Sequence, residues 1–562
     1  MTGTMRTNES VAPQVGLRGG LKIAFVVVLA ISFLWSWNRL NMSILGFFDD
    51  LGNVGNLFRR MYPPDFSDFG RIIRAMLETI WMALLGTVGA VILSYPLALG
   101  AARNTTPHPA IRNACRTIIT LSRAVPELIL AAIFVAAFGP GPFPGILGLA
   151  LHSIGMIGKL FAEAFEEAAD EPREAVESVG STRRQVIRSS VLPQALPSMI
   201  ATALFRFEIN LRGSSVLGLV GAGGIGIIIS ESLENIQYKP ALASVAVLFV
   251  VILVIELLSM SVRRSLIGES ANLSLSARRP RGFISQAILK RDVRVGIKAV
   301  EEKELNPPWT STRLFRTSVF VFFAGLVMIS ILSVDINWIS TFGNIDRINI
   351  VLKQMFPPSF AGESNLLISG LVESLAISIV ATVLGVLVAL PLGAAMARNV
   401  NLRRWLVTIL RMFVLALRGI PELIIAVIFV SAMGLGPVPG TLALTVTVVV
   451  FAAKLFADSL EEVNPAPREA VISVGATRGQ EFVSAVVPQF LSPFIANLFY
   501  LFDVYFRSST VLGIVGGGGI GYLLIQSIRV FQFRVTTMIV IFVFLIVLSI
   551  EYLGLGVKRL FR

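Results

Sequence analysis

Oppositely charged residues lie four positions apart within long apolar stretches of this 562-residue chain. Side chains at this spacing meet on one face of a helix, so one interpretation is an ion pair that neutralises itself in apolar surroundings. The other is that the arginines hold an anion, because a planar guanidinium fork matches the oxygens of a phosphate-like group. Both interpretations stay open for the pairs Arg123 and Glu127, Glu208 and Arg212, Arg418 and Glu422, and Asp503 and Arg507.

Two glycine-rich segments form the next candidate site. Both spell G-x-G-x-x-G, but a dinucleotide fingerprint needs a preceding strand and a βαβ unit, whereas these follow long apolar stretches. One interpretation is a bend with close helix packing. The other is a gate whose backbone N–H groups meet an anion. The glycines concerned are Gly221, Gly223, Gly224 and Gly226 in the first segment and Gly516, Gly518, Gly519 and Gly521 in the second.

Few other residues could carry out chemistry. The chain has one cysteine, Cys115, and two histidines, His108 and His152, without metal-ligand spacing. No nucleophile lies in a recognisable catalytic context, and no phosphate-binding Gly-Lys-Ser/Thr follows the glycines. We therefore predict that the chain is not an enzyme and binds no metal or cofactor itself. A lone His152 is interpreted as a core residue.

The elements that position these residues are predicted to be membrane-spanning helices. The chain is 54% hydrophobic and only 15% charged, with a mean hydropathy of +0.77. Its apolar runs are continuous, which excludes the alternating pattern of a barrel, and they approach the length of about 20 residues that a spanning helix needs. We predict an all-α polytopic membrane protein with spans at 21–37, 74–101, 116–137, 143–163, 196–218, 239–261, 317–334, 368–396, 410–432, 438–458, 491–513 and 535–556.

The net charge of +13 is interpreted as a topology signal. Basic residues gather in short loops, as in Arg103–Arg116, Arg398–Arg411 and the tail Lys558–Arg562, and such loops mark the cytoplasmic side of a membrane. Nucleic-acid binders instead cluster their basic residues on one folded face. We therefore expect membrane lipid as the surroundings, no nucleic-acid partner, and both termini in the cytoplasm.

The chain consists of two copies of one unit. Arg123-Ala-Val-Pro-Glu-Leu128 recurs as Arg418-Gly-Ile-Pro-Glu-Leu423, and three further motifs recur with the same offset of 295 residues. About six spans per copy make the repeats parallel, so equivalent loops face the same side. We predict a first transmembrane domain at 1–262, a basic cytoplasmic linker at 263–315 and a second transmembrane domain at 316–562. Basic residues at helical spacing in 283–300 fit either a surface helix or a flexible tether.

A polar segment lies between the fourth and fifth spans of each copy, at about 163–195 and 458–490, and we call these segments the first and second elbow. Gly180 is expected to end a short helix in the left-handed conformation. Thr182 and Gln185 are expected to form a capping box that starts another helix. Pro193 is expected to stop that helix before the fifth span. The second elbow repeats these devices with Gly475, Thr477, Gln480 and Pro488. One such bent pair could be an ordinary loop, but two on the same side favour docking of a partner.

The elbows resemble the EAA loop of ABC importer permeases. The matching residues are Glu174, Ala175 and Gly180 and, in the second copy, Glu469, Ala470 and Gly475, with Val176 and Val471 in place of the usual third alanine. In that family the loop docks on a cytoplasmic ATPase, so the resemblance implies two ATPase copies that carry ATP and Mg²⁺. The fold it implies is the type I importer transmembrane domain of the maltose and methionine permeases, in a prokaryotic plasma membrane.

More specifically, Arg-x-x-Pro-Glu-Leu at 123 and 418, Lys-Leu-Phe-Ala at 159 and 454, and Val216–Gly226 resemble the phosphonate permease family. The resemblance implies import of phosphonate, phosphite or phosphate, delivered by an extracytoplasmic solute-binding protein. The charged pairs would then line the translocation path. The paired outer segments Met61–Phe66 and Met355–Phe360 are interpreted either as interfacial aromatics or as a docking site for the binding protein.

A secondary transporter of an organic or inorganic anion is the alternative, because parallel repeats of six spans occur there too. Such a transporter would need no docking elbows and would show isolated acidic residues in its spans. Glu256 and Glu551 have no arginine one helical turn away, which keeps this alternative open. A membrane enzyme is disfavoured, because the chain lacks a recognisable catalytic arrangement.

Overall fold

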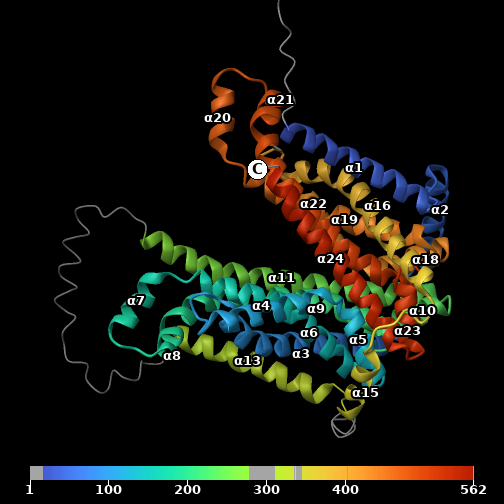
Figure 1. Ribbon diagram of the computed structural model, residues 1–562, viewed down its shortest axis with the longest axis horizontal. Coiled ribbons are helices and arrows are strands. Elements are labelled where there is room, and N and C mark those ends of the chain that lie inside the picture. Colours follow the sequence, from blue (N-terminus) through green and yellow to red (C-terminus); the bar gives the residue numbers. More distant parts are fainter. Residues whose placement is uncertain (1–16, 278–310, 335, 337–344, 401–402, 561–562) are drawn as a thin grey trace, which may run out of the picture. The chain divides into compact units, whose positions relative to one another are not determined.

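The computed structural model describes residues 17–277, 311–334, 336, 345–400 and 403–560, and every regular element among them is helical (Figure 1). This confirms the predicted all-α fold. The first repeat comprises α3 (Phe69–Ala101), α4 (Pro109–Ala124), α5 (Glu127–Phe138), α6 (Pro142–Glu166), α7 (Asp170–Ser178), α8 (Arg183–Val186), α9 (Leu192–Leu217), α10 (Ile225–Glu234) and α11 (Tyr238–Ala277).

The second repeat has the same order of elements. These are α16 (Ser364–Met396), α17 (Arg404–Arg418), α18 (Glu422–Met433), α19 (Pro437–Glu461), α20 (Pro465–Ser473), α21 (Arg478–Glu481), α22 (Val487–Leu512), α23 (Gly521–Arg529) and α24 (Phe533–Leu560). The remaining helices precede the repeats and are α1 (Leu17–Arg39), α2 (Ile44–Met61), α13 (Ser311–Ser333) and α15 (Ile345–Met355). The internal repetition read from the sequence is therefore also a repetition of structure.

Length and hydropathy allow eight of the described helices to cross a membrane, or eleven if each of three bent pairs is one span. The remaining one of the twelve predicted spans coincides with α13, which contributes a shorter apolar helix, Val321–Ser333. The last span of the first repeat continues as α11 to Ala277, beyond the predicted end at 261. The central part of the predicted linker, including 283–300, lies outside the described residues.

The helices pack into two compact units, and neither unit is a continuous half of the chain. One unit joins 1–67 and 229–245 to 345–562, so α1 packs against α16 and α2 against α18. In it, Arg39 donates to Ser369 at 3.2 Å. The other unit joins 68–228 to 246–344, so α13 packs against α3. Thus α1 and α2, which precede the first repeat, and α13, which precedes the second, pack in the unit built from the other repeat, whereas α15 packs against α24 of its own repeat. The boundaries at 262 and 316 remain a sequence-based prediction.

Small residues allow the two long helices of each repeat to approach closely. In the first repeat α3 packs along α6, and a Cβ added to Gly86 would lie 2.8 Å from the Cβ of Leu149. A Cβ on Gly148 would lie 2.9 Å from the backbone nitrogen of Ala131 on α5. Close backbone approach of this kind drives helix association where lipid removes the ordinary hydrophobic force. The packing of α3, α5 and α6 is therefore fixed by glycines.

The predicted third spans are broken, which corrects the continuous helices expected at 116–137 and 410–432. A bend of 86° separates α4 from α5, and one of 78° separates α17 from α18. The cause is local, because the residue before a proline avoids the helical conformation. Val125 is extended before Pro126, and Pro126 itself is the N-cap of α5. Pro421 has the same role at the start of α18.

Candidate functional site

In the first elbow, the end of the first short helix and the start of the second are as the sequence predicted. Gly180, which follows the C-cap residue Val179 of α7, has φ +78°, and Thr182 and Gln185 form the capping box of α8. The second elbow repeats this corner, with Gly475 at φ +82° and a capping box of Thr477 and Gln480. A positive φ costs glycine little, whereas it strains other residues. The sequence signals at both corners are confirmed.

The expectation that Pro193 and Pro488 stop the second arm of the elbow is wrong. Helix continues from α8 into α9 through a π turn at Ile187–Val191, and from α21 into α22 through a π turn at Phe482–Val486. The backbone N–H of the residue after each turn donates to the carbonyl five residues earlier, from Leu192 to Ile187 and from Val487 to Phe482. A π turn shifts the hydrogen-bond pattern by one residue, so a proline just after it meets no regular ladder. Each elbow is therefore continuous with its fifth span.

A glutamine holds the two arms of each elbow together. The backbone N–H of Ala169, at the start of the first arm, donates to Oε1 of Gln194 at 3.0 Å. Asn464 donates to Oε1 of Gln489 in the second elbow at 3.2 Å. These glutamines end the repeated Val-x-Pro-Gln motif, at the start of the fifth spans. Movement of an elbow is thereby tied to the helix that carries the charged residues.

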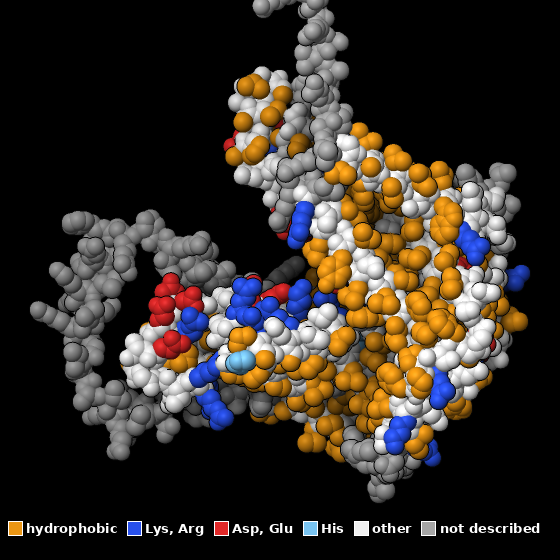
Figure 2. Space-filling view, viewed as in Figure 1, with side chains coloured by type: hydrophobic (Ala, Val, Ile, Leu, Met, Phe, Trp, Pro, Cys, Tyr) orange, Lys and Arg blue, Asp and Glu red, His pale blue; other side chains and the backbone are white. Residues whose placement is uncertain are grey.

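The tips of the elbows expose apolar side chains and differ in charge. Val179 is 78% exposed and Val474 is 82% exposed. The first arm, α7, has four acidic residues and one arginine, whereas α20 has one of each. Figure 2 shows the acidic side chains gathered at the position of α7 and apolar ones over α20. An exposed valine at the tip of a rigid corner is suited to insertion into another protein.

The pair Glu208 and Arg212 belongs to a triad. Nη2 of Arg212 donates to Oε1 of Glu208 and to Oε2 of Glu256, each at 3.0 Å. The two carboxylates are 1% and 3% exposed. The sequence missed this partner of Glu256 because it lies on another helix, α11. Glu256 is therefore not the isolated acid that kept a secondary transporter open.

The pair in the second repeat is simpler. Arg507 donates to Asp503 at 2.5 Å within α22, and both side chains are partly buried. Glu551, which corresponds to Glu256, is exposed. Both pairs in the fifth spans therefore adopt the ion-pair geometry, and their contact with a substrate remains a prediction.

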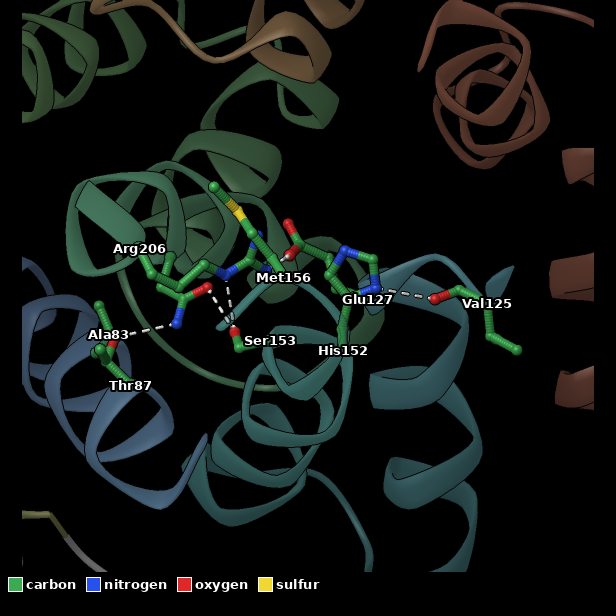
Figure 3. A network of polar contacts seen from close by, with 9 residues as sticks. Ala83, Thr87, Val125, Glu127, His152, Ser153, Met156 and Arg206 are labelled. Carbon is green, nitrogen blue, oxygen red and sulfur yellow. Dashed lines mark hydrogen bonds and ion pairs between the residues drawn. The ribbon is translucent and has the colours of Figure 1, made fainter. Parts of the chain in front are cut away.

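The other two pairs are not formed along one helix. The breaks at Pro126 and Pro421 place Arg123 and Glu127, and likewise Arg418 and Glu422, on different helices. Glu127 instead forms an ion pair with Arg206 at 3.5 Å, and Glu422 accepts a hydrogen bond from Ser508 at 2.7 Å. Figure 3 shows Glu127 beside Arg206, Ser153 and Met156. The proline breaks therefore remove the continuous helical spacing that the sequence suggested for these charges.

The glycine segments form tight turns whose backbone N–H groups bind neighbouring side chains. The N–H of Ile225 donates to Oγ1 of Thr79 at 2.8 Å, and that of Ile520 donates to Oγ of Ser374 at 2.9 Å. The N–H of Gly519 donates to Oε1 of Glu373 at 3.1 Å. These contacts support the packing interpretation. The role of a gate remains a prediction for all eight glycines.

The outer segments recur as expected, with a cis peptide bond at Tyr62-Pro63 and at Phe356-Pro357. Hydrogen bonds from the backbone and side chain of Ser67 hold the pKa of Asp65 below its ordinary value. Tyr62 and Phe356 are exposed. Within the described residues, no group of three or more His, Cys, Asp or Glu side chains could hold a metal ion.

Sequence reasoning missed one residue in the middle of a predicted span. Arg206 lies two residues before Glu208 and is 4% exposed. The available signal was its partner in the repeat, because Leu501 stands at the equivalent position. The acids Glu78 and Glu373 were also missed as neighbours of the glycine turns, although they too are a repeated pair.

A family model described as "binding-protein-dependent transport system inner membrane component" matches residues 94–267 and 389–561. The chain belongs to this family. Permeases of this family are membrane subunits of ABC transporters and are not enzymes in themselves, and membership implies ATPase and binding-protein partners. This permease is accordingly a multi-pass membrane protein.

Two curated relatives show how the permease halves are arranged. The permease is 41% identical to the "Phosphate-import permease protein PhnE" of Mycolicibacterium smegmatis over 506 residues, which cover 90% of this chain and 88% of that protein. It is 40% identical to the "Phosphite transport system permease protein PtxC" of Stutzerimonas stutzeri over 246 residues, 44% of this chain and 88% of that protein. The second match spans about one repeat, as expected for two permease domains fused in one chain.

Proposed function

We propose that this permease forms the translocation path for phosphonate, phosphite or phosphate, and that ATP hydrolysis on two copies of a separate ATPase drives uptake. The names of the relatives suggest the class of substrate. The observation that carries the proposal is the pair of elbows, each rigid, each tipped by an exposed valine and each continuous with a fifth span. Closure of an ATPase dimer on both elbows would move both fifth spans together.

The proposal assigns sides and partners. Both elbows and both termini face the cytoplasm of a prokaryotic cell, and ATP and Mg²⁺ bind to the ATPase. A solute-binding protein delivers the anion from outside, near the segments that contain Tyr62 and Phe356. Elbow residues Glu174, Ala175 and Gly180, with Glu469, Ala470 and Gly475, dock on the ATPase.

Transport in proteoliposomes tests the proposal. The permease reconstituted with its ATPase and binding protein should take up radiolabelled phosphate, phosphite or a phosphonate only when Mg-ATP is supplied. The nonhydrolysable nucleotide AMP-PNP and a proton gradient without ATP are the matched controls. Uptake driven by the gradient alone would contradict the proposal and favour a secondary transporter.

A further inference from the structure

The two repeats share a backbone but differ in a group of buried side chains. In the first repeat three of the four side chains are polar and buried and the fourth is a partly buried methionine, whereas the second repeat has apolar or aromatic residues at the same places. The set is Ser153, Met156, Arg206 and Asn210, and the equivalent residues are Val448, Phe451, Leu501 and Tyr505. The difference is confined to the interior of each repeat, where a sequence change alters packing and charge together.

Arg206 is the centre of this set (Figure 3). Its Nε donates to Oγ of Ser153 at 2.8 Å, Nη1 lies 3.7 Å from the sulfur of Met156, and Nη2 lies 3.5 Å from Oε2 of Glu127. A guanidinium has five N–H donors, and a thioether is a weak acceptor. The contact with Glu127 is also longer than the usual charge-assisted bond of about 2.7–2.9 Å. The outer fork of Arg206 is thus held loosely by its neighbours.

The inner side of Arg206 is held firmly. Ser153 donates to Oδ1 of Asn210 at 3.0 Å, and Asn210 donates to Oγ1 of Thr87 at 2.9 Å. The hydroxyl of Thr87 donates to the carbonyl of Ala83 on α3 at 2.7 Å. This chain of hydrogen bonds connects α9, α6 and α3. It fixes Nε of the guanidinium and directs the remaining donors towards Glu127.

The fold does not need this buried charge. The second repeat builds the same helices with Leu501 in place of Arg206 and Val448 in place of Ser153. The second repeat keeps the carboxylate as Glu422, which accepts a hydrogen bond from Ser508 at 2.7 Å, without an arginine at position 501. A buried arginine carries a desolvation cost that this arrangement avoids. An arginine kept at this cost inside a membrane-spanning helix is by default a functional hypothesis.

We infer that Arg206 is an oxyanion-binding residue of the first repeat and that Glu127 is the counter-ion that the anion displaces. This inference rests on the proposed function. The side chain of Glu127 is 25% exposed, whereas that of Arg206 is 5% exposed, so an anion reaches the guanidinium past the carboxylate. A tetrahedral phosphorus oxyanion offers two oxygens to the fork and replaces the negative charge that Glu127 supplies. The second repeat has no equivalent site, so the fused chain binds its anion asymmetrically.

Substitution by the residue of the other repeat tests the inference. Arg206→Leu should lower ATP-driven phosphate uptake at least about tenfold, because it removes charge-assisted bonds to the anion. Arg206→Lys should retain part of the activity with a higher KM, since an ammonium is a point charge without the fork. Leu501→Met is the matched control and should transport like the wild type. Leu501→Met should unfold at the wild-type temperature, whereas Arg206→Leu should lower the unfolding temperature because it leaves Glu127 without this cation. The double variant Arg206→Leu with Glu127→Gln removes both charges, so it should unfold near the wild-type temperature and still lose uptake.

A variant of the counter-ion gives an independent result. Glu127→Gln should lower the KM for phosphate, because the anion no longer competes with a carboxylate. An Arg206→Leu variant that takes up phosphate at the wild-type rate would overturn the inference. If the wild type shows no ATP-driven uptake, the proposed function fails. Equilibrium binding of inorganic phosphate to wild type and Arg206→Leu then decides the role of Arg206, and equal binding would refute it.

Discussion

Valine at Gly519 or Gly224 is expected to destabilise the permease by about 3 kcal/mol and to abolish transport. Both glycines have a positive φ, +81° and +79°, which costs a non-glycine residue about 1–2 kcal/mol. A Cβ on Gly224 would lie 2.6 Å from Oγ1 of Thr79, which accepts the N–H of Ile225, and one on Gly519 would crowd Ser374 in the same way. Loss of that buried hydrogen bond adds about 1–3 kcal/mol.

The matched control for this prediction is Gly434→Val. Gly434 also has a positive φ, +91°, but a Cβ there would meet no atom within 4 Å. The control should therefore show only the backbone strain, about half of the full effect, in thermal unfolding of the detergent-solubilised protein. Gly519→Val with wild-type stability and no transport would contradict the packing interpretation and support a gate.

Arg212→Gln is expected to lower stability by about 3–5 kcal/mol, the usual effect of removing one partner from a buried charged group. The structure places the guanidinium between Glu208 and Glu256, which are both almost fully buried. Without Arg212, both buried carboxylates lose the ion pair that it forms with them. The matched control is Arg507→Gln. Its partner Asp503 is 17% exposed, so removing this arginine should cost less.

Neutralising the acids separates this structural role from substrate binding. Adding Glu208→Gln and Glu256→Gln to Arg212→Gln should restore much of the unfolding temperature, because no uncompensated charge remains. If Arg212 acts mainly on the anion, the single variant will unfold like the wild type and lose uptake. Thermal unfolding and uptake measured on the same preparations distinguish the two outcomes.

The two repeats and the corners of the elbows could be predicted from the sequence alone. An offset of 295 residues and a few local signals, such as Gly180 with its capping box, depend on neighbours in the chain. The breaks at Pro126 and Pro421 were also encoded locally, but the strong hydropathy of the flanking residues concealed them. The π turns before Pro193 and Pro488 could not be foreseen, because continuing or ending a helix at a proline depends on the packing around it.

The contacts between side chains on different helices could not be predicted from the sequence. Charge spacing predicted Glu208 with Arg212 correctly, since both lie on α9. It could not show that Arg212 also binds Glu256 or that Glu127 pairs with Arg206, because those partners come from other helices. The packing of α1 and α13 in units built from the other repeat likewise depends on tertiary structure. Comparison of the two repeats would have identified Arg206, because Leu501 occupies the equivalent position in the second repeat.

The central claim is that both elbows face the cytoplasm and dock on the ATPase. Cys115 is the only cysteine, so Cys115→Ser provides a background in which Val179→Cys and Val474→Cys can each be labelled alone. A membrane-impermeant maleimide should label both positions in inside-out vesicles and neither in right-side-out vesicles, and bound ATPase should protect both. Labelling of the two positions from opposite sides, or labelling that the ATPase does not change, would contradict the account.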